Sequence, residues 1–241
     1  MQKLLLSILK TYLLITLLLV GFGILFPANQ KLWLFRYSVI LSLFIISIVN
    51  KIKEKSQNRL PFALLFAVIG DAFLYLAIPL KLIKPNIPLG LLSFFIAYGI
   101  IASAYARILF QHRKPIDRIL YLKQLALLLM ILSAVIFALR KSTLDNLIFG
   151  SMFILALLLV FMSALNLFFS TIFSIRLRTM IMISSMLMLI CDVGVILGFT
   201  LSPPDPIIYS IGTAIVWSAY IPAWTLLCLI SMDKEFDRVY L

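Results

Sequence analysis

Residues 61–80 read PFALLFAVIGDAFLYLAIPL, an apolar run that is interrupted by a single carboxyl, Asp71. Residues 178–201 read RTMIMISSMLMLICDVGVILGFTL and hold Asp192 in the same way. Runs of about 20 apolar residues cross a bilayer as helices, whereas barrel strands alternate over about 10 residues. A carboxyl at mid-depth is costly to insert, and such residues face a cavity or a pathway in most membrane proteins. The two aspartates are therefore the first candidates for a functional site.

The composition of the whole chain agrees with this fold class. Of its 241 residues, 63% are hydrophobic and 12% are charged, against about 45–50% apolar and about 25% charged in soluble domains. The sequence predicts an all-α, polytopic transmembrane bundle, a single integral membrane domain over residues 1–241. We read its first apolar stretch as a retained span and not a signal peptide, because Lys10 interrupts it and no small-residue cleavage site follows.

Loop signals divide the chain into about eight predicted spans, at residues 4–26, 32–49, 61–80, 87–110, 119–139, 146–173, 179–201 and 207–230. Eight spans place both termini on one side of the membrane. Of the 21 Lys and Arg residues, all but six lie on that side, and the six are Lys31, Arg36, Lys81, Lys84, Arg140 and Lys141. Because Lys and Arg favour cytoplasmic loops, we predict cytoplasmic termini, in a multi-pass protein expected in the bacterial inner membrane.

The predicted topology brings four polar residues to similar depths. At a rise of 1.5 Å per residue, Asp71 lies roughly 15 Å from the cytoplasmic end of its span and Asp192 roughly 20 Å. Tyr98 lies roughly 18 Å deep in the fourth span and Tyr220 roughly 15 Å deep in the eighth. We therefore predict a buried polar cavity built from these four spans.

Each of these features also has a structural interpretation. A buried carboxyl can be neutral and bonded to a neighbouring helix, and a membrane tyrosine finds a hydrogen-bond partner easily. Gly70, beside Asp71, is expected to let two helices approach closely. Asn166, in a predicted span, is expected to make a hydrogen bond between helices.

Several function classes find little support. The net charge of +12 comes from basic residues in short loops, so we expect contacts with membrane lipids and no nucleic-acid partner. His112 is the only histidine, and Cys191 and Cys228 have no metal-ligand spacing. We expect no metal and no cofactor, and the sequence leaves the oligomeric state open.

Four stretches, in this order, resemble the YhhN-like lysoplasmalogenase family of multi-span membrane proteins. They are FALLFAVIGDAFLYL (62–76), LGLLSFFIAYGIIASAYARIL (89–109), SSMLMLICDVGVILGF (184–199) and IVWSAYIPAWTLLCLIS (215–231). Asp71 and Asp192 match the family's two acidic positions. The chain departs from the pattern at Tyr98, where the family has His, at Trp224, where it has Gln, and at Cys191, where it has Ser.

The resemblance implies an enzyme that hydrolyses the vinyl ether bond of a lysoplasmalogen, with a lysophospholipid as its substrate. The products are a fatty aldehyde and a glycerophospho-alcohol. It implies that Asp71 and Asp192 are catalytic, and that Tyr98, Tyr220 and Trp224 bind substrate. The chemistry needs one protonated carboxyl and one carboxylate, which two nearby acids in a low dielectric supply by sharing a proton. Which aspartate is the acid stays open.

Two other functions remain possible on the residues alone. The same carboxyls can serve a non-enzymatic lipid-binding or transport protein as a proton relay or cation site. An intramembrane aspartyl protease has less support: Val68 stands where its G-x-G-D motif needs glycine, and Cys191 precedes Asp192 in place of tyrosine.

Overall fold

The computed structural model describes residues 2–26, 31–76, 87–112, 144–200 and 206–240, together with residues 123, 124, 126, 127, 130, 133 and 137. All regular structure in this part of the chain is helical, as predicted. The α-helices are α1 (Gln2–Leu25), α2 (Lys31–Glu54), α3 (Leu60–Asp71), α5 (Ile87–Gln111), α7 (Leu144–Phe169), α8 (Ile175–Thr200), α9 (Pro206–Ser231) and α10 (Lys234–Tyr240). A π-helix, η1 (Ala72–Leu76), continues α3.

Among the described residues, four helical segments are long and apolar enough to cross a bilayer. They are Leu5–Gly23, Leu34–Glu54, Pro88–Gln111 and Gly150–Phe169. A fifth is added if Val216–Ser231 and Lys234–Tyr240, which meet at 66°, are counted as one span. These helices have the length and composition of an integral membrane protein.

The helices follow most of the predicted spans, with several differences. The helix α2 continues to Glu54, five residues beyond the predicted end, and α8 begins at Ile175, four residues before the predicted start. The predicted span 146–173 ends early, because α7 stops at Phe169. The predicted span 61–80 changes from α-helix to π-helix directly after Asp71, and its last residues lie outside the described part. The short helix α10 was not predicted. Most of the predicted span 119–139 also lies outside the described residues.

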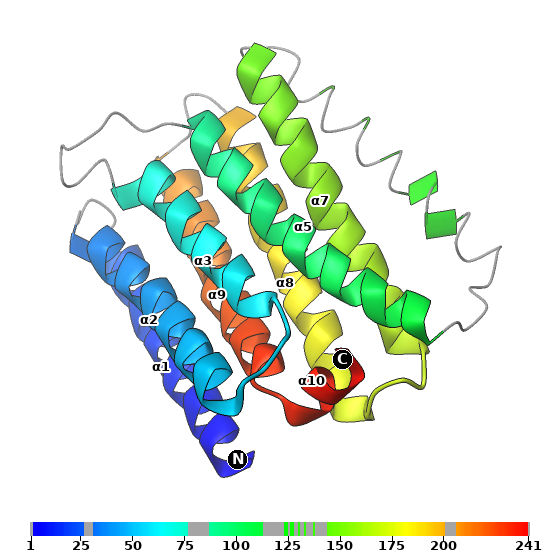
Figure 1. Ribbon diagram of the computed structural model, residues 1–241. Coiled ribbons are helices and arrows are strands. Elements are labelled where there is room, and N and C mark those ends of the chain that lie inside the picture. The colour runs from blue at the N-terminus through cyan, green and yellow to red at the C-terminus, as the bar shows by residue number, and fades with distance from the viewer. Residues whose placement is uncertain are drawn as a thin grey trace.

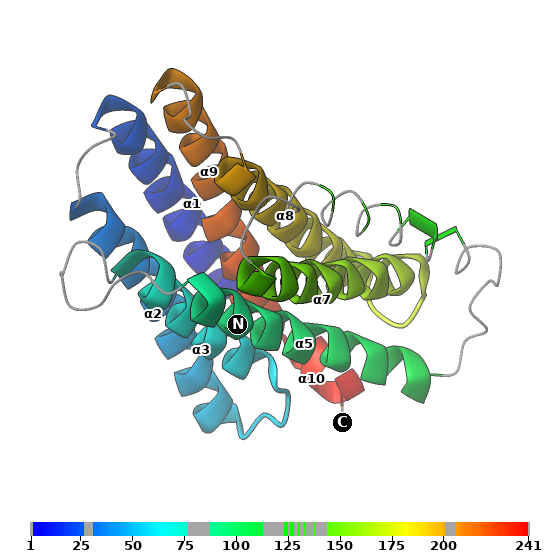
Figure 2. The same cartoon turned by 90° about the horizontal axis from the view of Figure 1, so that it is seen from above.

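Six helices form a closed ring, and the seventh long helix packs on its outside. Around the ring α2 packs on α3, α3 on α5, α5 on α7, α7 on α8, α8 on α9, and α9 again on α2, while α1 packs mainly on α9. Figure 2 shows α2, α3 and α5 along one side and α1, α9 and α8 along the other. The N- and C-termini lie at the same end of the bundle (Figure 1). The ring interior is the natural place for polar groups, since its exterior exposes large apolar side chains such as Phe62 and Phe110.

Two packing predictions are confirmed. A Cβ on Gly70 would lie 2.7 Å from Phe94 Cε2 and 3.3 Å from the Gly90 carbonyl oxygen, so glycine permits the close approach of α3 and α5. Asn166 Nδ2 donates to Gln124 Oε1 at 3.0 Å, a bond from α7 to the helical segment that contains Gln124. Both contacts hold neighbouring segments in register.

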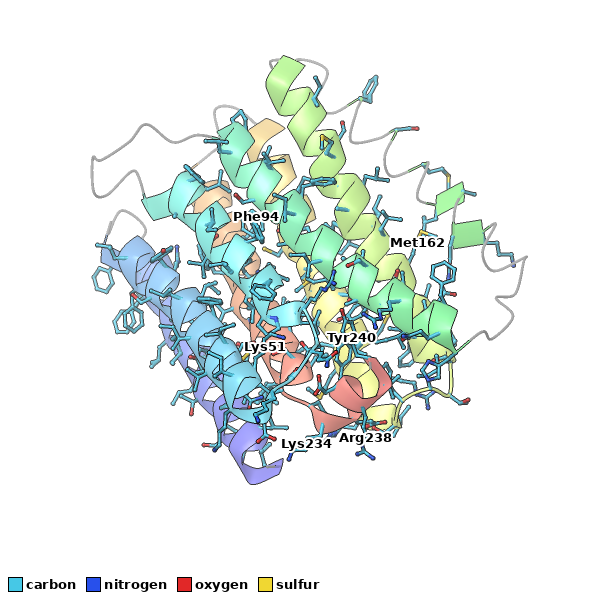
Figure 3. The ribbon with its side chains drawn as sticks, viewed as in Figure 1. Lys51, Phe94, Met162, Lys234, Arg238 and Tyr240 are labelled. Carbon is cyan, nitrogen blue, oxygen red and sulfur yellow. The ribbon has the colours of Figure 1, made fainter. Side chains whose placement is uncertain are left out.

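The helix α10 makes hydrogen bonds to two connecting segments at the end of the bundle where the termini lie. Ser174 donates to Glu235 through its backbone N–H and its hydroxyl, both at 2.6 Å, and Ser56 Oγ donates to Asp237 Oδ1 at 2.6 Å. Figure 3 shows Lys234, Arg238 and Tyr240 on this helix, at the end of the bundle where the C-terminus lies. The hydrogen bonds of this polar layer do not involve Asp71 or Asp192.

Candidate active site

Asp71 is the last residue of α3 and is held by a tyrosine of α9. The helix begins with Pro61 in its first turn, where a missing N–H costs nothing, and then buries an apolar face up to Gly70. The side chain of Asp71 is 1% exposed. Its two carboxyl oxygens each lie 2.9 Å from the Tyr220 hydroxyl, which donates to them. The change to a π-helix follows immediately, a local distortion that is frequent at functional sites.

Asp192 lies inside α8, eight residues before the end of that helix. Its side chain is 4% exposed, and the Tyr98 hydroxyl of α5 donates to its Oδ2 atom. The Cys191 thiol also interacts with this carboxyl. Each aspartate is therefore paired with one tyrosine from another helix. The sequence predicted that these four residues lie near one another, and the fold shows how they pair.

The two carboxyls open onto one small cavity inside the helical ring. It leaves about 20 Å³ for the centre of a water molecule, which is enough for one water. Six elements contribute side chains to its wall, which is apolar apart from the carboxyls, one thiol and one phenol. The lining residues are Asp71, Leu74, Leu91, Phe94, Phe153, Cys191, Asp192, Val216, Trp217 and Tyr220.

A cluster of aromatic side chains packs against both tyrosines. Phe94, labelled in Figure 3, projects from α5 into the ring. Its ring centre is 6.3 Å from that of Tyr98, 6.4 Å from that of Tyr220 and 6.3 Å from that of Trp224. Trp224 stacks on Tyr98 with 6.0 Å between ring centres and 17° between planes. Bulky, rigid rings in mutual contact fix where the two phenol hydroxyls point.

The predicted site residues fall into two layers. Asp71, Asp192 and Tyr220 line the cavity. Tyr98 and Trp224 are fully buried behind it, where Tyr98 holds Asp192 and Trp224 packs against Tyr98. The fold thus brings all five residues together, with direct access to the cavity for three of them.

Sequence reasoning did not select seven residues of the wall, among them Phe94, Trp217 and Cys191. Helical spacing was the available signal for two of them. Phe94 lies four residues before Tyr98, and Trp217 lies three residues before Tyr220, so each shares a helix face with a selected tyrosine. Cys191 is adjacent to Asp192 in the chain but points toward the same cavity, which only the fold reveals.

The arrangement can protonate and deprotonate a bound molecule at two points that face one small cavity. Two carboxyls around a water-sized, apolar cavity act in a low dielectric, where their electrostatic effects are stronger than in water. Within the described part of the chain, no group of three or more His, Cys, Asp or Glu residues is arranged to hold a metal ion.

In comparisons with models of protein families, with curated proteins and with solved structures, the chain matches none.

Proposed function

We propose that this chain is a membrane hydrolase that cleaves the vinyl ether bond of lysoplasmalogens by acid catalysis at Asp71 and Asp192. The observation that carries the proposal is that these two carboxyls, from α3 and α8, line a single water-sized cavity in an apolar bundle. The resemblance of four stretches to the lysoplasmalogenase family, at the same two aspartates, supports the choice of reaction.

The reaction divides naturally between the two acids. One protonated carboxyl transfers its proton to the β-carbon of the vinyl ether, which leaves an oxocarbenium ion. The other, ionised, carboxylate stabilises the cation and takes a proton from the water that adds to it. The resulting hemiacetal breaks its C–O bond to the glycerol and releases a fatty aldehyde and a glycerophospho-alcohol. One water is consumed, and the pair returns to its singly protonated form.

The surrounding side chains suit this chemistry. Tyr220 and Tyr98 each donate a hydrogen bond to one carboxyl, which fixes the carboxyls in place. We assign Tyr220 a substrate-facing role, since it lines the cavity, and Tyr98 and Trp224 a positioning role behind it. The volume of the cavity matches the one water that the reaction consumes.

The substrate needs more room than this small cavity offers. The side chain of Leu74, in the π-helix η1, is pressed against Gly90 of α5, where a Cβ would lie 2.5 Å from its Cγ and Cδ2 atoms. Leu74 and Leu91 both line the cavity. We propose that the vinyl ether enters by displacing these leucines, at the point where the regular hydrogen bonding of α3 changes to that of a π-helix.

The same proposal includes the full topology. Eight spans with both termini in the cytoplasm, in a bacterial inner membrane, agree with the distribution of Lys and Arg and with termini that lie at one end of the bundle (Figure 1). In this orientation α10 and its polar contacts lie at the cytoplasmic surface.

The test uses mass spectrometry to measure the aldehyde that the purified chain releases from a lysoplasmalogen. We expect Asp71→Asn and Asp192→Asn each to lower the rate by about 10²–10⁴-fold, the usual contribution of a general acid or base. Asp237→Asn, in α10, is the matched control and should leave the rate unchanged. The proposal is wrong if the unmodified chain releases no aldehyde, or if both variants release it at the unmodified rate.

A further inference from the structure

A buried arginine lies next to the aspartate cavity and is not used in the mechanism above. Arg36 follows the first residue of α2 by five positions, and its side chain is 3% exposed. Its guanidinium carbon lies 4.6 Å from the ring centre of Trp217 in α9. On the other side, its Nη2 atom is so close to α1 that a Cβ on Gly23 would lie 2.6 Å from it. Three helices therefore hold the charge in place.

Trp217 connects this charge to the catalytic pair. One side of the indole meets Arg36, and the same side chain lines the aspartate cavity. Its ring centre lies 5.2 Å from that of Tyr220, in an edge-to-face contact at 83°, and Tyr220 donates to Asp71. Trp217 thus contacts the guanidinium and also contributes to the cavity wall.

The chemistry of the guanidinium points to an anionic oxygen ligand. A cation inside an apolar bundle is costly and commonly marks a functional site. The planar fork of an arginine matches two oxygens of a phosphate, and stacking on an indole keeps that fork in one plane. Arg36 is also within two turns of the N-terminal end of α2, so it lies near the level of the lipid head groups.

We propose that Arg36 binds the phosphate of the lysophospholipid whose vinyl ether enters the aspartate cavity. This inference rests on the proposed function, because it assigns a second contact to the same substrate. In a lysoplasmalogen, a three-carbon glycerol unit separates the phosphate from the vinyl ether oxygen. Trp217 then forms the wall between the subsite for the phosphate and the subsite for the ether, and Arg36 selects phosphorylated over neutral ether lipids.

The test compares the binding of two lipids that the enzyme cannot hydrolyse, 1-O-hexadecyl-lysophosphatidylethanolamine and 1-O-hexadecylglycerol. Binding to the purified chain in detergent is followed by tryptophan fluorescence. We expect the unmodified chain to bind the phospholipid at least about tenfold more tightly, as charge-assisted hydrogen bonds provide. Arg36→Gln should bring the ratio of the two affinities close to one, whereas Arg36→Lys, which keeps the charge, should retain part of the preference.

Two glycines of α1 allow a second test that leaves Arg36 itself unchanged. One gives the variant and the other gives its matched control. Gly23→Ala places a methyl group against Nη2 and should shift the guanidinium, at little cost to folding because that atom ends a flexible side chain. Gly21→Ala, one half-turn away in the same helix, meets nothing within 4 Å. We expect Gly23→Ala to lower the phosphate preference several-fold and Gly21→Ala to leave it unchanged.

The inference is overturned if the unmodified chain shows no preference for the phospholipid. It is also overturned if Arg36→Gln weakens the binding of both lipids by the same factor. A third refuting result is an equal preference for the phospholipid in Gly23→Ala and Gly21→Ala. Since neither lipid can react, the outcome is independent of catalysis. A chain that selects the phospholipid through Arg36 but releases no aldehyde from a lysoplasmalogen retains the phosphate subsite and refutes the proposed hydrolysis alone.

Discussion

Gly70→Ala tests whether the close approach of α3 and α5 sets the geometry of the aspartate cavity. The new Cβ would lie 2.7 and 2.8 Å from two carbons of the Phe94 ring and 3.3 Å from the Gly90 carbonyl oxygen. The ring is packed among Tyr98, Tyr220 and Trp224, and so has little room to turn. Overpacking of this kind costs about 1–3 kcal/mol, while replacing a helix glycine by alanine returns about 0.5–1 kcal/mol.

Gly99→Ala is the matched control, because it lies in α5 and its added Cβ would meet nothing within 4 Å. Both variants gain the same helix propensity, so the difference between them isolates the overpacking, about 1–3 kcal/mol. With about 2–4 °C per kcal/mol for a chain of this size, Gly70→Ala should melt several degrees below Gly99→Ala in detergent, measured by intrinsic fluorescence. It should also release aldehyde more slowly, because Phe94 is pushed toward the cavity. Equal melting temperatures for the two variants would refute the reasoning.

Two tyrosine variants test the hydrogen bonding of the interior. Tyr220→Phe removes the hydroxyl that donates to both oxygens of Asp71. Because a hydrogen bond to a charged group contributes about 1.5–3 kcal/mol, single-turnover aldehyde release should slow by about 10–100-fold. An unchanged rate would contradict the role assigned to Tyr220. Tyr105→Phe removes a buried hydroxyl that has no hydrogen-bond partner among the described residues. Its desolvation is then no longer a cost, so the melting temperature should stay the same or rise by a few degrees, and a fall of several degrees would show that the hydroxyl is bonded.

Sequence patterns located the polar groups of the interior better than the aromatic ones. Asp71, Asp192 and Asn166 stand out because each is a polar residue in an apolar run, and a membrane interior makes such residues expensive. Depth then selected Tyr98 and Tyr220, which the fold pairs with the two aspartates. The aromatic residues of the wall gave no such contrast, since a membrane helix has many apolar side chains on every face.

Arg36 is a polar residue whose place in the interior the sequence did not indicate. In the sequence it is one of six basic residues outside the loops that we predict to be cytoplasmic, and the predicted topology alone explains its position near a span end. In the fold its guanidinium is buried against Trp217 and Gly23. Long basic side chains can point either to water or into the bundle, and only the packing of neighbouring helices decides between them.

The sequence by itself determined that this chain is all-helical, with helices apolar enough to cross a membrane, and it singled out two carboxyls inside apolar runs. Those conclusions need only the length and polarity of apolar runs, which depend on the bilayer and not on neighbouring helices. The tertiary structure decided that Asp71 and Asp192 face one cavity, which tyrosine each of them meets, and that Arg36 stands behind Trp217. The physical reason is that a helix apolar on all sides carries no periodic signal for the face it buries, so its rotation and its partners are set by packing alone.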